Sequence, residues 1–244
     1  MKKILCLSAF IGLCIIGFSS FAQKTITFQA KDGLAVTADW YYIDPNATTI
    51  ILCHQAGYSR GEYLQTSRRF NKLGYNVIAI DLRSGDRVCS INNETAKAAK
   101  AAKKPSDYID AEQDIVAAID YVYKQLNKNV ILLGSSYSAS LVLKIAKEND
   151  KVDAAVAFSP GEYFGSSLSV QKAIAGLNKP VFVASSKSEA PNVTSLIKDV
   201  TSKNKSQFVP SHEGAHGSKC LWSVSEGNQE YWLALMFFLQ NYNK

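Results

Sequence analysis

The chain has 244 residues and a formal net charge of +6. This length fits one well-packed domain and is short for two. The positive charge is concentrated in an Ala/Lys-rich stretch, residues 95–104, but no nucleic-acid motif or interleaved aromatic residue accompanies it. We therefore expect a solvated helix or loop there and no nucleic-acid partner.

Residues 1–22 have the pattern of a secretory signal peptide. Two lysines precede a short apolar run, residues 4–18, and small residues follow it. The run is too short for a membrane span, and no stop-transfer pattern follows. We predict cleavage after Ala22, export to the periplasm or the medium, and a mature domain over residues 23–244 without a membrane span.

The mature sequence begins with two β-rich runs around Lys31-Asp32-Gly33, which predict a hairpin. Continuous apolar runs follow at residues 49–54, 75–82, 129–134, 152–159 and 179–186. Unbroken apolar strands are typical of a sheet that is covered on both faces.

Helical patterns alternate with these strands. Apolar residues recur every three or four positions between Asp107 and Leu126, and similar patterns occupy residues 62–73, 140–148 and 230–241. The alternation predicts an α/β fold, with a mostly parallel central sheet entered through an antiparallel hairpin and helices on both faces. There is no room for a large cap domain, and we expect residues 83–106 and 161–177 to form the pocket walls.

Ser136 lies between the strand at residues 129–134 and the helix that follows. Ligands bind outside the carboxyl ends of the strands in such sheets. The run from Gly134 to Ser138 matches Gly-x-Ser-x-Gly, the turn that presents a serine nucleophile, except that Ser138 replaces the second glycine. A serine that only caps the helix is the alternative interpretation.

A serine hydroxyl needs a histidine to accept its proton, and that histidine needs an acid to orient it. His216, in a glycine-flanked loop, is the predicted base, and His212 is a weaker candidate. Glu189, after the strand at residues 179–186, is the predicted acid, with Glu162 as the alternative. The chain order serine, acid, histidine is that of the α/β-hydrolases.

A tetrahedral intermediate also needs donors for its negative oxygen. Backbone N–H groups supply them, one from the residue after the nucleophile and one from a loop after an early strand. Here these would be Tyr137 and the loop that contains Gln55 and Ala56. We expect His54 to give this loop its structure and not to act as a base.

Three segments, residues 54–57, 134–138 and 214–217, make the chain resemble the α/β-hydrolase superfamily, and in particular its compact dienelactone hydrolases and small esterases. The resemblance covers nearly all of the mature sequence. Gln55, Ser138 and Glu189 depart from the family pattern.

The resemblance implies a serine hydrolase that cleaves a small-molecule carboxylic ester through an acyl-enzyme on Ser136, without a cofactor or a metal ion. A peptidase or amidase of the same fold is one alternative. A catalytically silent binding protein on this scaffold is another.

Three cysteines, Cys53, Cys89 and Cys220, lie outside residues 1–22. They are too few for a fold built on disulfides, and their odd number leaves one unpaired in a monomer. We expect Cys53 to be the unpaired residue, because it lies within an apolar strand, and a bridge between Cys89 and Cys220 stays open.

Overall fold

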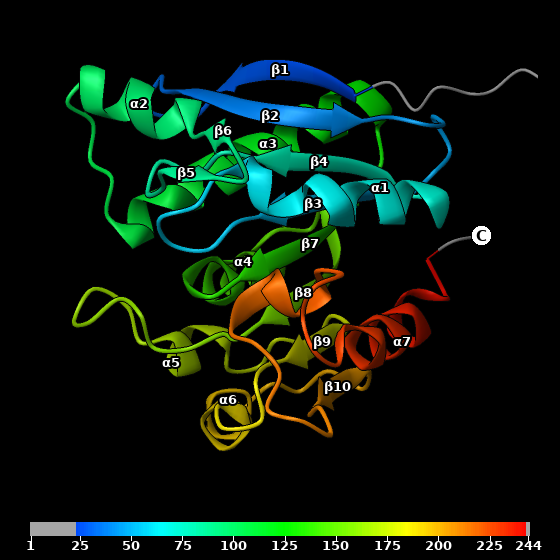
Figure 1. Cartoon of the computed structure of the whole chain (residues 1–244). Coiled ribbons are helices and arrows are strands. Elements are labelled where there is room, and N and C mark those ends of the chain that lie inside the picture. Colours follow the sequence, from blue (N-terminus) through cyan, green and yellow to red (C-terminus); the bar gives the residue numbers. More distant parts are fainter. Residues whose placement is uncertain (1–22, 243–244) are drawn as a thin grey trace, which may run out of the picture.

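The computed structural model describes residues 23–242. Its main feature is an eight-stranded sheet in the order β1-β2-β4-β3-β7-β8-β9-β10 (Figure 1). The strands of this sheet are β1 Gln23–Gln29, β2 Ala35–Tyr41, β3 Thr49–Cys53, β4 Asn76–Ile80, β7 Val130–Ser135, β8 Val152–Phe158, β9 Val181–Ala184 and β10 Lys205–Phe208. The predicted signal peptide lies outside the described residues. Within them, no helix is long and apolar enough to span a membrane.

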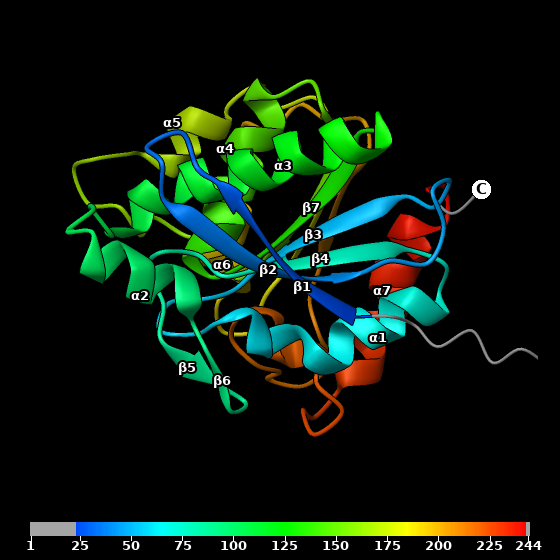
Figure 2. The same ribbon diagram turned by 90° about the horizontal axis from the view of Figure 1, so that it is seen from above.

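Helices cover both faces of the sheet, as Figure 2 shows, with α3 and α4 on one side and α1 and α7 on the other. These helices are α1 Leu64–Lys72, α3 Glu112–Leu126, α4 Tyr137–Glu148 and α7 Asn228–Leu239. Side chains alternate along β3, so that Ile51 and Cys53 pack in the core on the first side, and Ile50 and Leu52 in the core on the second. The central strands are therefore mostly apolar, because nearly all of their residues are buried on both faces of the sheet.

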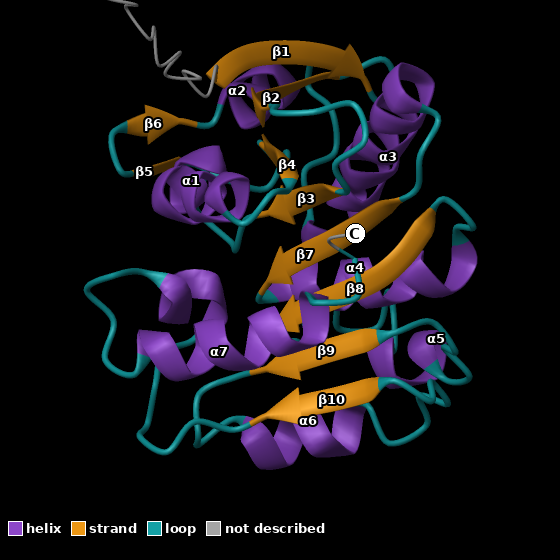
Figure 3. Cartoon of the chain, turned by 90° about the vertical axis from the view of Figure 1, so that its right-hand side faces the viewer, coloured by secondary structure: helices purple, strands orange, loops and turns teal. Residues whose placement is uncertain are grey.

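The N-terminal hairpin is the only antiparallel entry to this sheet within residues 23–242. β1 pairs antiparallel with β2, and β2 with β4, whereas all later neighbours are parallel (Figure 3). The turn between β1 and β2 uses Asp32, whose carboxylate accepts the N–H of Leu34, and Gly33, whose φ of 80° favours glycine. The predicted fold class is confirmed.

Shorter elements complete the chain. They are the 3₁₀ turns η1 Arg60–Tyr63, η2 Tyr108–Ala111 and η3 Gly217–Leu221, the strands β5 Arg87–Val88 and β6 Ile91–Asn92, and the helices α2 Glu94–Ala101, α5 Val170–Ile174 and α6 Ala190–Leu196. The helices predicted at residues 62–73 and 107–126 thus begin as 3₁₀ turns. At the second of these starts the Asp110 carboxylate accepts the N–H of Asp107, which closes a tight first turn. The Ala/Lys-rich stretch forms α2.

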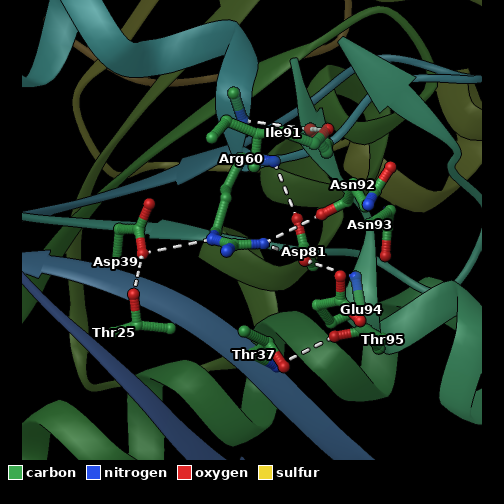
Figure 4. Close-up of polar contacts among 12 residues, drawn as sticks. Thr25, Thr37, Asp39, Arg60, Asp81, Ile91, Asn92, Asn93, Glu94 and Thr95 are labelled. Atoms are coloured by element: carbon green, nitrogen blue, oxygen red, sulfur yellow. Dashed lines mark hydrogen bonds and ion pairs between the residues drawn. The ribbon is translucent and has the colours of Figure 1, made fainter. Parts of the chain in front are cut away.

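Arg60 joins α2 and the β5–β6 hairpin to the sheet (Figure 4). Its guanidinium lies 3.1 Å from the buried Asp39 carboxylate of β2 and 2.6 Å from that of Asp81, which follows β4. The same group donates to the carbonyl of Asn92, and Asp81 accepts the N–H of Glu94 at the start of α2. A buried carboxylate needs such partners to offset its lost hydration, so this pairing holds the β5–β6 hairpin and the start of α2 against the sheet. Of residues 83–106, a predicted pocket wall, Ser106 lines a cleft near the site.

The register of the parallel strands brings the chemically interesting loops together. Cys53 of β3 pairs with Gly134 of β7, which pairs with Ala157 of β8. These strands end at the same edge, so the loops after them lie side by side.

The three cysteines within residues 23–242 are all free thiols. Cys89 is exposed in the turn between β5 and β6, whereas Cys220 is buried in η3. The bridge left open between them does not form, and Cys53 is unpaired as predicted.

Candidate active site

Ser136 occupies a sharp turn between β7 and α4. Its φ of 60° and ψ of −124° are unusual for a residue with a side chain. Such a conformation costs energy and persists only where neighbouring contacts enforce it. Here the Ser136 N–H donates to the carbonyl of Phe158 at 2.8 Å, and its carbonyl accepts the N–H of Ala139 at 2.9 Å.

The residues beside this turn must be small, because strand and helix approach closely. A Cβ atom on Gly134 would lie 2.5 Å from the carbonyl oxygen of Ser138. The Ser138 hydroxyl accepts the N–H of Ser135 at 2.9 Å and lies 2.8 Å from the carbonyl of Cys53. The serine that replaces the second glycine of the motif therefore braces the turn against β3.

His216 lies between Ser136 and Glu189. Its Nε2 is 2.9 Å from the Ser136 hydroxyl oxygen, and its Nδ1 is 2.5 Å from Oε1 of Glu189. Because a carboxylate only accepts, Nδ1 carries the hydrogen and Nε2 is free to accept the serine proton. The structure thus brings together the three residues predicted as nucleophile, base and acid.

The loop that carries His216 packs directly against the turn that carries Ser136. Gly217 has a φ of 69°, and a Cβ atom on it would lie 2.5 Å from the Ser135 hydroxyl. Its N–H donates to the hydroxyl of Ser159 at 2.9 Å. The glycine is needed here for both its conformation and the close approach.

Glu189 is held in its ionised form. Burial raises the pKa of this carboxyl, but hydrogen bonds from His216, Ser159 and the Ser186 N–H outweigh burial and lower the pKa to about 2. The Ser159 hydroxyl is 2.7 Å and the Ser186 nitrogen 3.1 Å from Oε2. A negative charge therefore faces the imidazole at neutral pH, where it stabilises an imidazolium.

Two of the three predicted oxyanion donors have free N–H groups. Within residues 23–242, the backbone N–H groups of Tyr137 and Ala56 have no protein acceptor. The N–H of Gln55 instead donates to the Glu62 carboxylate at 2.9 Å. Gln55 therefore does not supply an oxyanion donor from its backbone, which corrects that expectation.

His54 is buried and neutral. Burial lowers its pKa to about 4. Nδ1 is 2.8 Å from the carbonyl of Gln55, and Nε2 accepts the N–H of Leu82 at 2.9 Å. The Asn93 amide lies 3.1 Å from the same Nε2. This histidine thus joins the 54–57 loop to the end of β4, as its expected structural role requires.

The two alternative residues lie elsewhere. The Glu162 carboxylate accepts the N–H groups of Val170 and Gln171, at 2.7 and 2.9 Å, and so caps α5. His212 is exposed beside Glu230. The structure does not bring either residue to Ser136.

Two clefts lie beside these residues: Glu189 lines one of them, and Tyr163 lines both. One, of about 320 Å³, is lined by Ser106, Asp107, Tyr108, Ile109, Tyr163, Phe164 and Ser167. The Tyr108 ring stacks on that of Tyr137 at 4.5 Å, and the Tyr163 hydroxyl donates to the carbonyl of Ser159 at 2.8 Å. The other cleft, of about 460 Å³, includes Glu162 and Glu189. A larger cleft of about 770 Å³ lies between β1 and α3, and neither the three residues nor Tyr163 line it.

Metal ligands do not gather in the described part of the chain, where no group of three or more His, Cys, Asp or Glu side chains could hold an ion.

The sequence did not identify two polar residues that contact the site, Glu62 and Ser159, or Arg60, which precedes Glu62 by two positions. Arg60 and Glu62 lie in the run Ser-Arg-Gly-Glu-Tyr, residues 59–63, where opposite charges flank a glycine that three residues separate from the 54–57 loop. A Cβ atom on Gly61 would lie 2.4 Å from the carbonyl oxygen of Val88, so this turn is tightly packed. The pair of opposite charges is the feature of the sequence that points to these two residues. The burial of their side chains becomes visible only in the folded structure.

A model of the dienelactone hydrolase family matches residues 32–220. The comparison with curated proteins gave no match. An esterase from Pyrococcus furiosus has a similar structure, with a TM-score of 0.72, 17% sequence identity and 100% of both chains covered. A dienelactone hydrolase from Anabaena variabilis gives a TM-score of 0.69 at 13% identity, over 91% of this chain and 99% of that one.

An acylaminoacyl peptidase from Pyrococcus horikoshii also shares the fold, with a TM-score of 0.69 and 13% identity. This match covers 92% of the present chain but 42% of the peptidase. At such identities these structures establish the fold alone, whereas the family model spans most of the sequence. The chain belongs to the dienelactone hydrolase family, and it is a hydrolase with the α/β-hydrolase fold.

Proposed function

We propose that this chain hydrolyses a carboxylic ester through an acyl-enzyme on Ser136, with His216 as base and Glu189 as acid. The observation that carries the proposal is the continuous contact through the imidazole, 2.9 Å from Nε2 to the serine and 2.5 Å from Nδ1 to the glutamate. A base within hydrogen-bond reach of the nucleophile, and an acid that fixes the base, are what acyl transfer requires.

In the acylation step the Ser136 oxygen attacks the ester carbonyl carbon while Nε2 of His216 takes the hydroxyl proton. The carbonyl oxygen becomes an oxyanion, for which the N–H groups of Ala56 and Tyr137 are the proposed donors. The intermediate collapses when the C–O bond to the alcohol breaks and the imidazolium returns the proton to the leaving oxygen. The products of this step are the alcohol and an ester on Ser136.

In the second step His216 accepts a proton from water, which attacks the acyl carbon. Collapse of this intermediate breaks the bond to Ser136 and returns the proton to its oxygen. Glu189 stays ionised throughout, because its pKa of about 2 lies far below neutrality. Its charge stabilises the imidazolium in both steps.

For the substrate we propose a small ester whose acyl or alkoxy group is neutral and apolar or aromatic. The cleft of about 320 Å³ has aromatic walls in Tyr108, Tyr163 and Phe164, and Asp107 lies at its rim. No Lys or Arg side chain lines this cleft or the neighbouring cleft at Glu189, in the part of the chain that the structure describes. A site without cations disfavours anionic substrates.

The test is a panel of short-chain and long-chain aryl esters, lactones and peptides, measured on wild type, Ser136→Ala and Ser135→Ala. We expect ester turnover, and a loss of about 10³- to 10⁶-fold in Ser136→Ala against a far smaller loss in Ser135→Ala. Turnover of peptides but not esters would replace the ester proposal with a peptidase or amidase. A wild-type protein inactive on the whole panel would favour a binding role.

We also propose that the enzyme is exported after cleavage behind Ala22. The support is the order of charged, apolar and small residues in positions 1–22. N-terminal sequencing of the protein from an expressing bacterium tests this: the proposal requires a chain that begins at Gln23, and an uncleaved Met1 in the mature protein would reject it.

A further inference from the structure

Glu62 is a buried carboxylate that contacts three separate segments of the site. It lies in η1 and is 1% exposed. One oxygen, Oε2, accepts the backbone N–H of Gln55 at 2.9 Å. The other, Oε1, accepts the hydroxyls of Ser135 at 3.0 Å and Ser218 at 2.6 Å. The Gln55 side-chain amide adds a longer contact of 3.4 Å.

Each of these partners lies within two residues of a group in the proposed mechanism. Gln55 directly precedes Ala56, a proposed oxyanion donor. Ser135 directly precedes the nucleophile, and Ser218 follows the base by two residues. One carboxylate therefore holds the loop of the oxyanion donor, the turn of the nucleophile and the loop of the histidine.

The two serines are also bonded to each other, since the N–H of Ser218 donates to the Ser135 hydroxyl at 2.8 Å. The Ser135 oxygen thus accepts from the histidine loop and donates to Glu62. A movement of Glu62 would therefore shift the nucleophile turn and the histidine loop together. Gly217 packs directly against the Ser135 hydroxyl and leaves no space between the two segments.

Stability alone does not account for a carboxylate at this position. Burial raises the pKa of Glu62, against hydrogen bonds from Ser218, Gln55 and Ser135. A raised pKa means that holding the charge in this place costs folding free energy.

We infer that Glu62 is a positioning residue that sets the mutual distances of nucleophile, base and oxyanion donor. This inference rests on the proposed function. A displacement of about 1 Å in such a site can lower the rate by about 10². Glu62 lines neither of the two clefts beside the triad, so we expect its replacement to change substrate binding little.

The discriminating variant is Glu62→Met, which fills a similar volume but accepts no hydrogen bond. We expect a folded protein whose kcat on an aryl ester falls by about 10- to 100-fold, with KM changed by less than about threefold. Glu62→Gln should lie closer to wild type, because its amide can still bond to the serine hydroxyls. A folded Glu62→Met protein with wild-type kcat would overturn the inference.

Asn71→Ala is the matched control. Asn71 is a buried polar residue on the adjacent helix α1, where its amide donates to the carbonyls of Tyr41 and Tyr75 at 3.0 and 2.8 Å. We expect a lower Tm and an unchanged kcat. A matching fall in kcat in this control would mean that general loosening, and not the contacts of Glu62, slows the enzyme, and would reject the inference.

Two further variants separate the remaining possibilities. If Glu62→Met does not fold, Ser218→Ala removes a single contact of the carboxylate, and unchanged kcat in that variant would reject the inference. Ser136→Ala reports on the mechanism itself. Full turnover by Ser136→Ala rejects the proposed function, whereas an inactive Ser136→Ala beside a fully active Glu62→Met rejects only the role of Glu62.

Discussion

The hydroxyl of Ser159 donates a 2.7 Å hydrogen bond to Oε2 of Glu189, the carboxylate oxygen that His216 does not contact. The same hydroxyl accepts the N–H of Gly217 at 2.9 Å. Ser159 directly follows β8 and has a φ of 53°, a left-handed conformation that is unusual for a residue with a side chain. One serine at the end of a strand therefore fixes both the acid and the loop of the base.

We predict that Ser159→Ala lowers kcat by about tenfold, because a hydrogen bond to a charged group contributes roughly 1.5–3 kcal/mol and part of it is regained from water. Ser202→Ala is the control, since that hydroxyl accepts the N–H of Asn204 and has no other hydrogen-bond partner within residues 23–242. Steady-state kinetics on one aryl ester suffice. Equal rates in the two variants would show that Ser159 does not orient the acid.

For the acid itself, Glu189→Gln should lose about 10² to 10⁴ in turnover, because the imidazolium loses its counter-charge while the oxyanion donors and the clefts survive. Glu162→Gln should lose less than about tenfold. Its carboxylate caps α5, so we expect a lower Tm of the variant instead. If Glu162→Gln loses more turnover than Glu189→Gln, the assignment of the acid is wrong, although Ser136 can still be the nucleophile.

Two histidine variants test the base. His216→Ala should lose at least about 10³ in turnover, whereas His212→Ala should retain it, since His212 is exposed beside Glu230. Turnover by the wild type should also fall on acidification, because only a neutral imidazole accepts a proton. The reverse pattern, an active His216→Ala and an inactive His212→Ala, would exchange their roles.

The sequence predicts the architecture well because strand and helix periods are local properties. The apolar runs around Ile51 and Leu132 show which strands are covered on both faces, and the carboxyl-edge rule then places Ser136, Glu189 and His216 near one another. Where the chain departs from a motif, the reason is spatial. Ser138 replaces a glycine because its hydroxyl bonds across the turn.

Contacts between distant segments are what the sequence does not supply. The N–H of Gln55 looks available until the fold brings Glu62 to it. Cys89 and Cys220 both follow strands, yet one is exposed in a hairpin turn and the other buried beneath the site. Arg60 reads as an ordinary surface residue, although the fold places it between two buried carboxylates.

His54 should make stability depend on pH. Its folded pKa of about 4 lies below the ordinary value of 6.5, so above pH 6.5 both the folded and the unfolded chain hold it neutral. As the pH falls from 6.5 toward 4, His54 binds a proton in the unfolded chain but stays neutral in the folded chain. The free energy of unfolding therefore decreases. The loss should reach about 2 kcal/mol between pH 7 and pH 5.

Urea unfolding of wild type and His54→Gln at both pH values measures this contribution. The variant should be less stable at pH 7, because its hydrogen bonds to the 54–57 loop are altered, but its stability should change less on acidification. An identical pH dependence in the two proteins would mean that His54 is not the group responsible.

The central claim, that Ser136 is the nucleophile, is tested most directly by covalent labelling. A fluorophosphonate forms a stable bond with an activated serine oxygen, and mass spectrometry of the digested protein identifies the labelled residue. We predict one label per chain, on Ser136, in the wild type, and none in Ser136→Ala or in unfolded wild type. A folded, ester-cleaving protein that stays unlabelled, or that carries the label on another residue, would contradict the account.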